Sequence, residues 1–304
     1  MRALCYAQTN IGSGRDNNED NYYCNGTFKR DPAIPVAEAA AEQESRRLIY
    51  GVFDGMGGEA NGEQAALLCA RRGDQFITMA DFEEAEIKVL AGPEKRSRVV
   101  PEHERKLTAY HEAGHAIVMH ALPTHDPVHQ ITIVPRGGAG GMTISLPTED
   151  RSYQSKRYME EQIVSLLGGR VAEKLMLGDI STGASNDIQR ASQIARKMVT
   201  VYGMSDRLGP MVYSENEGEV FLGRSVTKTT NISEKTMQEV DAEVRRIIDE
   251  QYAIARRLIE ENRDKMEVMA KALLDWETID ADQIDDIMEG RAPRPPKTSK
   301  EAVK

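Results

Sequence analysis

Two histidines four residues apart, with a glutamate directly after the first, are the side chains in this sequence most suited to chemistry. They are His111, Glu112 and His115, within YHEAGHAIV at residues 110–118. On a helix, residues four apart lie on one face, so both imidazoles can bind a single metal ion. In H-E-x-x-H sites the glutamate takes a proton from zinc-bound water, whose pKa the metal lowers to roughly 7. The spacing therefore predicts a zinc hydrolase with Glu112 as base, against the alternative of a chance pattern on a solvated helix.

A zinc site of this kind needs a third protein ligand, and two carboxylates compete for that role. Asp187 follows a Gly-containing turn in GDISTGASNDIQRA and should lie in the first turn of a helix, where the helix dipole favours its ionised form. Its alternative role is N-terminal capping. Glu173, in GGRVAEKL, is the rival ligand, although a glutamate in the middle of a helix more often supports a ligand or faces solvent.

Three other residues on the histidine helix have expected roles of their own. The small Ala113 and Gly114 leave room for a substrate backbone or for a neighbouring helix. His120 comes one residue too early for an extended three-histidine motif and points off the metal face. We expect His120 to be a packing residue or to support a ligand from behind.

The elements that must position these residues are mostly helices. QITIVPRGGAGGMTISL, at residues 130–146, has two β-branched runs separated by glycines and predicts a strand pair or an irregular edge strand. Apolar residues recur at three- and four-residue intervals in three later segments, which predicts helices there. These segments are residues 160–177, 186–203 and 231–274, the last with a break near Asn262.

Composition limits the class of protein. The chain has 304 residues and a net charge of −10, which argues against a nucleic-acid binder because no basic stripe dominates. The three cysteines, Cys5, Cys24 and Cys69, are too few and too scattered for a disulfide framework or a cysteine zinc site. No window approaches eighteen apolar residues, and the start lacks the apolar core of a signal peptide. We therefore expect a cytoplasmic chain with no membrane segment.

From about Glu63 to its end, the chain closely resembles the FtsH family of ATP-dependent zinc metalloproteases. The resemblance rests on ITMADFEEAEIKVLAGPEK, AYHEAGHAIV, SLLGGRVAEKL and TGASNDIQRA, in that order. It implies that His111, His115 and Asp187 bind zinc, that Glu112 is catalytic, and that the substrates are unfolded or damaged proteins. It also implies six-membered rings, and a strand edge from PRGGAGGMT along which an extended polypeptide can pair.

Two parts of the FtsH pattern are expected to be missing. Such proteases carry membrane helices and an ATPase module before the peptidase, and here only the end of the ATPase lid, within residues 63–97, is recognisable. GEVFLGRS, at residues 218–225, mimics a phosphate-binding loop, but Arg224 replaces the required lysine and no strand-helix pattern frames it. We therefore expect no ATP site.

The first sixty residues have a strand-and-turn pattern, unlike the helical segments that follow. The pattern predicts strands at residues 3–9, 16–26 and 48–55, with a surface loop or short polar helix at 32–47. TNIGSGRDNNEDNYY and YGVFDGMGGEANGE resemble the start of the bacterial-type metal-dependent serine/threonine phosphatases. That resemblance implies a pair of Mg²⁺ or Mn²⁺ ions, with Arg15 gripping phosphate. The implied metal-binding positions are Glu19, Asp20, Asp54 and the carbonyl of Gly55.

The phosphatase family needs further aspartates and most of a β-sandwich, which this chain lacks, so residues 1–62 are expected to be a severed fragment. The expected fold is mainly α: a helical zinc-peptidase domain at 98–290 with a small β element, preceded by an incomplete α/β fragment, and a disordered tail at 291–304. The expected function is a zinc metalloendopeptidase that acts on unfolded proteins. The alternative is a phosphatase-like regulatory or binding module with an inactive, oligomerising peptidase part.

Overall fold

The computed structural model describes most of the chain after residue 99, namely residues 100–147, 151–213 and 232–296. Before that it describes strands within residues 2–53 and parts of 65–95. None of the described helices has the length and apolar character needed to cross a bilayer.

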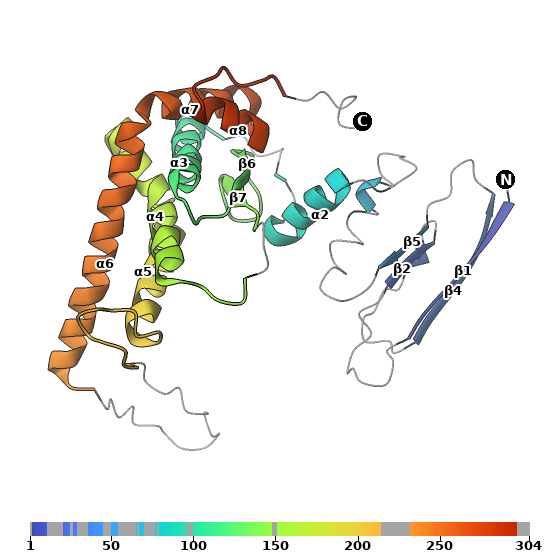
Figure 1. The fold of residues 1–304 in the computed structure, drawn as a ribbon. Helices are drawn as coiled ribbons and strands as arrows, with labels where there is room; N and C mark the ends of the chain where they lie inside the picture. The colour runs from blue at the N-terminus through green and yellow to red at the C-terminus, as the bar shows by residue number, and fades with distance from the viewer. Residues whose placement is uncertain are drawn as a thin grey trace. The chain divides into compact units, whose positions relative to one another are not determined.

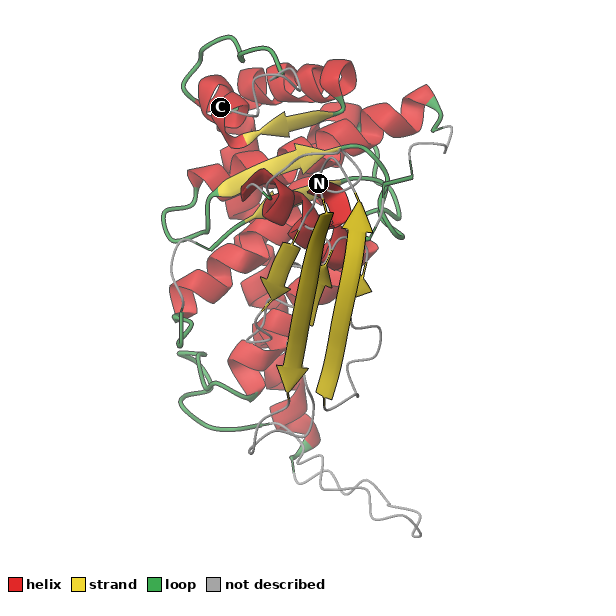
Figure 2. Cartoon of the chain, turned by 90° about the vertical axis from the view of Figure 1, so that its right-hand side faces the viewer, coloured by secondary structure: helices red, strands yellow, loops and turns green. Residues whose placement is uncertain are grey.

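Contacts divide the chain into two units, the larger of which, within residues 96–297, is mainly helical. Figure 1 labels its helices and colours them by their order along the chain, and Figure 2 shows more helix than strand among the described residues. The helices are α3 (Glu102–Ala121), α4 (Lys156–Ala172), α5 (Ser185–Thr200), α6 (Glu234–Glu261), α7 (Arg263–Trp276) and α8 (Ala281–Met288), with a π-helical turn η1 (Glu173–Leu177) directly after α4. The expected mainly α fold is confirmed.

A three-stranded antiparallel sheet accompanies these helices. Its order is β7-β6-β8, with β6 at Val128–Thr132, β7 at Met142–Ser145 and β8 at Thr278–Asp280. The strand pair expected at residues 130–146 is therefore confirmed as β6 and β7. The third strand, β8, was not expected, and it pairs with β6 although α4 to α7 lie between the two strands in the sequence. β7 lies at one edge of this sheet.

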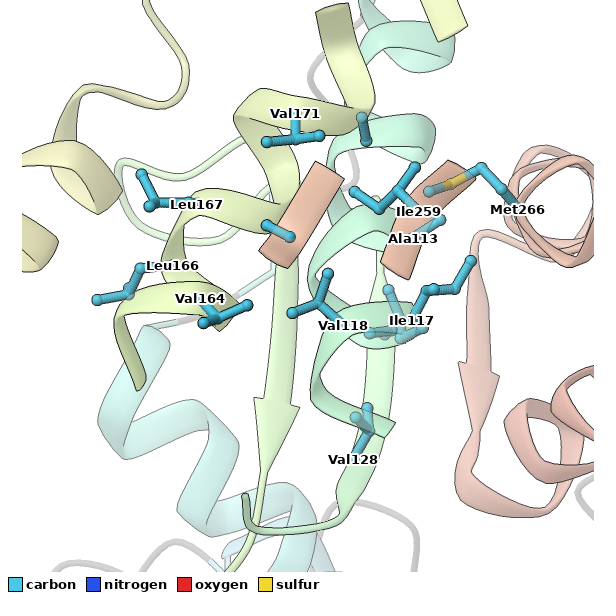
Figure 3. Close-up of a cluster of buried hydrophobic side chains, with 14 of the residues drawn as sticks. Ala113, Ile117, Val118, Val128, Val164, Leu166, Leu167, Val171, Ile259 and Met266 are labelled. Carbon is cyan, nitrogen blue, oxygen red and sulfur yellow. The ribbon is translucent and has the colours of Figure 1, made fainter. Parts of the chain in front are cut away.

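The core of the unit is built around α3. Ala113 and Ile117 of α3 belong to one buried cluster with Ile259 of α6 and Met266 of α7, and all four are fully buried (Figure 3). Full burial of an Ile or Met side chain stabilises the fold by about 1.5–3 kcal/mol. These contacts hold the histidine-bearing helix in place from the side away from the metal face.

α3 and α4 touch through their backbones. A Cβ atom added at Gly114 would lie 2.7 Å from the carbonyl oxygen of Gly168 and 2.5 Å from the Cβ of Ala172. The reverse also holds, since a Cβ at Gly168 would lie 2.7 Å from the carbonyl oxygen of Gly114. The room expected at Ala113 and Gly114 is therefore taken by a neighbouring helix.

The long helical segment breaks where the pattern predicts. α6 ends at Glu261 and α7 begins at Arg263, and the Asn262 side-chain amide donates to the carbonyl of Leu258 at 2.8 Å. Asn262 thus satisfies one of the carbonyls left free at the end of a helix. The expected break near Asn262 is confirmed.

The beginning of the segment expected to be a disordered tail makes hydrogen bonds to α8. Arg294 Nε donates to Asp286 Oδ2 at 2.7 Å, and the amide of Gln283 donates to the carbonyl of Arg294 at 2.9 Å. Asp286 is only 5% exposed, so its carboxylate needs charged partners, and Arg291 and Arg294 supply them. The tail expected at residues 291–304 therefore has hydrogen bonds to α8 at its beginning, its disorder stays a prediction, and residues 297–304 lie outside the described part.

The described elements of the smaller unit include five strands and the helix α2. They are β1 (Arg2–Asn10), β2 (Asn21–Cys24), β3 (Thr27–Phe28), β4 (Val36–Glu44), β5 (Tyr50–Phe53) and α2 (Met79–Ala91). β1 pairs with β4, and β2 lies between β3 and β5. The loop or polar helix expected at 32–47 is wrong, because β4 pairs with β1 over nine residues and this backbone pairing overrides the helix propensity of an alanine-rich segment.

Candidate metal centre

The two histidines of α3 face each other on the buried side of the helix. His111 Nε2 and His115 Nε2 are 3.0 Å apart, and the two side chains are among the buried polar groups of the unit. Their four-residue spacing on a continuous helix produces this arrangement, as expected from the sequence.

Asp187 completes the group from another helix. It lies in the first turn of α5, as expected, and its Oδ2 is 3.4 Å from His111 Nε2 and 3.6 Å from His115 Nε2. One ligand atom from each residue lies within 4.8 Å of the other two, so the three residues could hold one metal ion. Two imidazole nitrogens and one carboxylate oxygen suit zinc and leave a fourth position open.

Glu173 meets the opposite side of the His111 ring. Its Oε1 is 2.7 Å from His111 Nδ1, and its Oε2 accepts from the backbone N–H of Ser181 at 2.6 Å. Glu173 is the first residue of the π-helical turn η1 and is fully buried. This carboxylate fixes the ring of His111 so that Nε2 faces Asp187, and contacts of this kind orient histidines at metal sites.

The ring of His115 is held in the same way by α4. Its Nδ1 donates to the carbonyl oxygen of Ser165 at 2.7 Å. α4 also passes so close to the pair that a Cβ at Gly169 would lie 2.6 Å from the Nε2 atoms of both histidines. Only glycine at this position leaves both imidazoles where they are.

The charges of the metal-free site are strongly coupled. Burial lowers the pKa of His111, but its hydrogen bonds with Asp187 and Glu173 outweigh burial and raise that pKa to about 10. For Asp187 the directions are reversed. Burial raises its pKa, yet hydrogen bonds with His111 and His115 outweigh burial and hold that pKa well below the usual range. The two carboxylates that flank the His111 ring therefore favour its protonated form.

Glu112 lies beside this group and is also buried. Its Oε2 accepts a hydrogen bond from the Thr143 hydroxyl of β7 at 2.8 Å. Burial raises the pKa of Glu112, although His115, His111 and the Thr143 hydrogen bond act in the opposite direction. A carboxylate whose pKa is raised toward neutrality is a stronger base, which suits proton transfer.

Several residues singled out from the sequence lie elsewhere. His120 is exposed and bonds Asp285 Oδ1 at 3.3 Å, so the expectation that it packs or supports a ligand is wrong. Its position near the end of α3 turns it toward α8 instead. Some of the expected residues lie outside the described part of the chain. They are the phosphate-loop mimic at 218–225, which was rejected from the sequence, the candidate phosphate-binding Arg15, and the candidate Mg²⁺ or Mn²⁺ positions Glu19, Asp20, Asp54 and Gly55.

Two contacts of the site were not expected from the sequence. Thr143 bonds Glu112 across 31 residues, and Ser181 bonds Glu173 across the loop before α5. In the sequence, Thr143 is only one β-branched residue of an expected strand, and nothing in that pattern indicates a hydrogen bond to Glu112. The close approach of α4 to α3 did have a signal in the sequence, namely the paired glycines in LLGGRV, because glycines in a helix often mark a close backbone approach.

Residues 98–287 match the family model described as peptidase family M41. The chain belongs to peptidase family M41. This M41 chain is 56% identical over 234 residues to the "ATP-dependent zinc metalloprotease FtsH" of Cupriavidus metallidurans, a match covering 77% of the chain and 36% of the relative. It is 58% identical over 227 residues to "ATP-dependent zinc metalloprotease FtsH 2" of Alkaliphilus metalliredigens, covering 75% of the chain and 33% of the relative.

A third relative extends the similarity further along the chain. The M41 chain is 55% identical over 256 residues to "ATP-dependent zinc metalloprotease FtsH 1" of Thermoanaerobacter sp., a match covering 84% of the chain and 42% of the relative. The chain thus spans between 33% and 42% of the length of these curated relatives. The expected resemblance to FtsH proteases is confirmed at the level of the family.

Proposed function

We propose that the chain is a zinc metalloendopeptidase that hydrolyses peptide bonds of unfolded or damaged proteins. The observation that carries this proposal is the convergence of His111 Nε2, His115 Nε2 and Asp187 Oδ2 beside the buried carboxylate of Glu112. Membership of family M41 supports it, as do relatives named as zinc metalloproteases.

We propose His111, His115 and Asp187 as the residues that hold the zinc ion. The donor set fits, because both histidines present Nε2 to Asp187 while their Nδ1 atoms are engaged by Glu173 and Ser165. When bound, zinc supplies Lewis-acid chemistry that makes a water molecule acidic near neutral pH.

Glu112 acts in this proposal as the general base and then as the acid. It accepts a proton from the water that attacks the carbonyl carbon, and it later donates that proton to the leaving amine nitrogen. Its burial and its position directly after His111 support the role. The other carboxylates of α3, Glu102 and Glu104, belong to its first turn and lie far along the helix from the two histidines.

Substrate binding is proposed to occur along β7. Among the described strands, β7 pairs only with β6, so one edge is available for pairing with an extended polypeptide. Backbone pairing of this kind reads little of the substrate sequence, which suits a protease for unfolded proteins.

The larger assembly follows from the FtsH resemblance alone. We propose that residues 98–290 form the peptidase domain, that residues 63–97 are the end of an ATPase lid, and that the peptidase assembles into six-membered rings on the cytoplasmic side of the membrane. The relatives are named as ATP-dependent, and we propose that the peptidase serves such an ATP-dependent protease.

Metal removal and readdition test the proposed function. We expect the purified chain to contain about one zinc ion and to cleave unfolded casein slowly. Chelation should abolish cleavage and zinc should restore it. Casein cleavage at the full rate after zinc has been removed would contradict the proposal.

No observation favours a second activity. The family-model match begins at residue 98, and the residues that resemble a phosphatase metal site lie outside the described part of the chain. The alternative, a phosphatase-like module with an inactive peptidase part, rests only on the sequence resemblance of residues 1–62.

A further inference from the structure

We propose that Thr143 is a positioning residue that orients Glu112 for proton transfer and couples the edge strand β7 to the base. This inference rests on the proposed function, since it takes Glu112 to be the base. It assigns a role to a residue that lies outside the H-E-x-x-H motif and is not one of the proposed zinc ligands.

The hydrogen bond of Thr143 fixes one oxygen of the base. Thr143 Oγ1 is 2.8 Å from Glu112 Oε2 and 3.1 Å from the Glu112 carbonyl oxygen. Among the described residues, no other hydrogen bond to the Glu112 carboxylate is found. Because Oε2 accepts the hydroxyl proton, Oε1 is the oxygen without a hydrogen bond among the described residues and the one better placed to receive a proton from water.

The stem of Glu112 is held by the same segment. A Cβ at Gly141 would lie 2.9 Å from Glu112 Cγ, 2.6 Å from Thr108 Cγ2 and 2.8 Å from the Thr132 carbonyl oxygen. The backbone at Gly141 therefore passes directly against the Glu112 side chain. Residues 141 and 143 together constrain both the stem and the head of the base.

The position of Thr143 on β7 couples the base to the substrate strand. Successive side chains of a strand point to opposite faces, so Thr143 faces α3 while Met142 and Ile144 face away from Glu112. Thr143 pairs in register with Ile131 of β6, which is fully buried. A polypeptide paired along the other edge of β7 would thus lie beside the strand whose Thr143 orients Glu112. Movement of β7 would move the polypeptide and the Glu112 carboxylate together.

Three variants at this position separate the hydroxyl from the shape of the side chain. Thr143→Val keeps the size and β-branching of threonine and removes the hydroxyl, whereas Thr143→Ser keeps the hydroxyl. The comparison is repeated without the branch by Thr143→Ala against Thr143→Ser, in case the valine variant folds poorly. Zinc content and Tm of each variant report whether the fold and the metal site are intact.

The expected result is a loss in kcat with little change in KM. Thr143→Val and Thr143→Ala should lower kcat for casein by about 10- to 100-fold, the range typical of losing an orienting hydrogen bond at a metal site. Thr143→Ser should stay close to the parent, and zinc content should be the same in all four proteins. Equal kcat values for the hydroxyl-bearing and hydroxyl-free variants would overturn the proposal.

A binding measurement tests the same point without turnover. A peptide hydroxamate chelates zinc and hydrogen-bonds a neighbouring carboxylate, so its affinity for the zinc-loaded protein, measured by calorimetry, reports the orientation of Glu112. We expect weaker binding to Thr143→Val than to Thr143→Ser. If the parent cleaves nothing, the proposed function fails, whereas equal hydroxamate affinities of the two variants would overturn the role of Thr143 itself.

Discussion

The two acidic residues that touch His111 have different tasks because they meet different ring nitrogens. Asp187 faces Nε2, the nitrogen turned toward His115, whereas Glu173 bonds Nδ1 on the far side of the ring. Both residue types were candidates for the third ligand, and residue type alone does not separate them. The π-helical turn that places Glu173 behind His111 has no periodic signature in the sequence.

Zinc occupancy of two variants tests this division of tasks. Asp187→Ala removes a donor atom and should leave the purified protein with little zinc. Glu173→Ala leaves all three proposed donors in place and should weaken zinc binding by about 10- to 100-fold, so zinc is lost only under a competing chelator. Metal analysis before and after dialysis against the chelator measures the zinc content of both variants. Less zinc in Glu173→Ala than in Asp187→Ala would make Glu173 the ligand.

The metal-free site should respond to pH with a definite sign. The pKa of His111 is raised from 6.5 to about 10 on folding, so the stability it contributes is fully present below about pH 6.5 and is lost as the pH rises toward 10. Asp187 and Glu173 have lowered pKa values and stay ionised throughout this window. Zinc must displace the His111 proton, so zinc affinity rises over the same range.

The measurable consequence is a gap in Tm that widens with pH. We expect the difference between zinc-loaded and metal-free protein to be larger near pH 9 than near pH 6.5, because the metal-free form loses stability while zinc binding strengthens. Thermal scans of both forms at the two pH values test this. A gap that stays constant or narrows would mean that His111 carries no extra proton in the metal-free protein.

At the scale of elements, the close crossing of α3 and α4 is what brings the histidines against Gly169 and Ser165. Gly114→Ala would push a Cβ into the backbone of α4 and should destabilise the fold by about 1–3 kcal/mol. Gly138→Ala is the matched control, because nothing lies within 4 Å of its added Cβ and its φ is not positive. Urea unfolding of both variants measures the difference, and equal stabilities would show that the crossing tolerates a side chain.

The sequence predicts those elements whose signal is local. Repeated apolar positions predict α4 to α7, and Asn262 marks the break between α6 and α7. The three-residue strand β8 gives no periodic signal of its own, because it exists through pairing with β6, some 146 residues earlier. The alanine-rich β4 fails for the same reason, since its partner β1, and not its own composition, decides its conformation.

The site itself is predictable to the same extent. The histidine spacing and the helix start before Asp187 are local patterns, and both are where they were expected. The bonds from Thr143 to Glu112 and from Ser181 to Glu173 depend on how distant segments pack. Local patterns therefore indicate which residues do chemistry, and packing determines which residues orient them.

At the scale of the whole molecule, the proposed metal ligands, Glu112 and the core around α3 all lie within the unit at residues 96–297. A chain shortened to begin near Ala80 should therefore keep its zinc content and its peptidase rate. Its Tm should stay within a few degrees, since 1 kcal/mol corresponds to roughly 2–4 °C in a domain of this size. Loss of zinc, or a much lower Tm, would show that the first residues are needed by the peptidase.

The most direct test of a zinc peptidase with Glu112 as its base is to measure zinc content and casein hydrolysis side by side for the parent and Glu112→Gln. Glutamine has the shape of glutamate and can still accept the Thr143 hydrogen bond, but it cannot take a proton from water. We predict about one zinc ion in both proteins and a loss of hydrolysis of about 100-fold or more in the variant. A variant that keeps its zinc and digests casein as fast as the parent would contradict the mechanism.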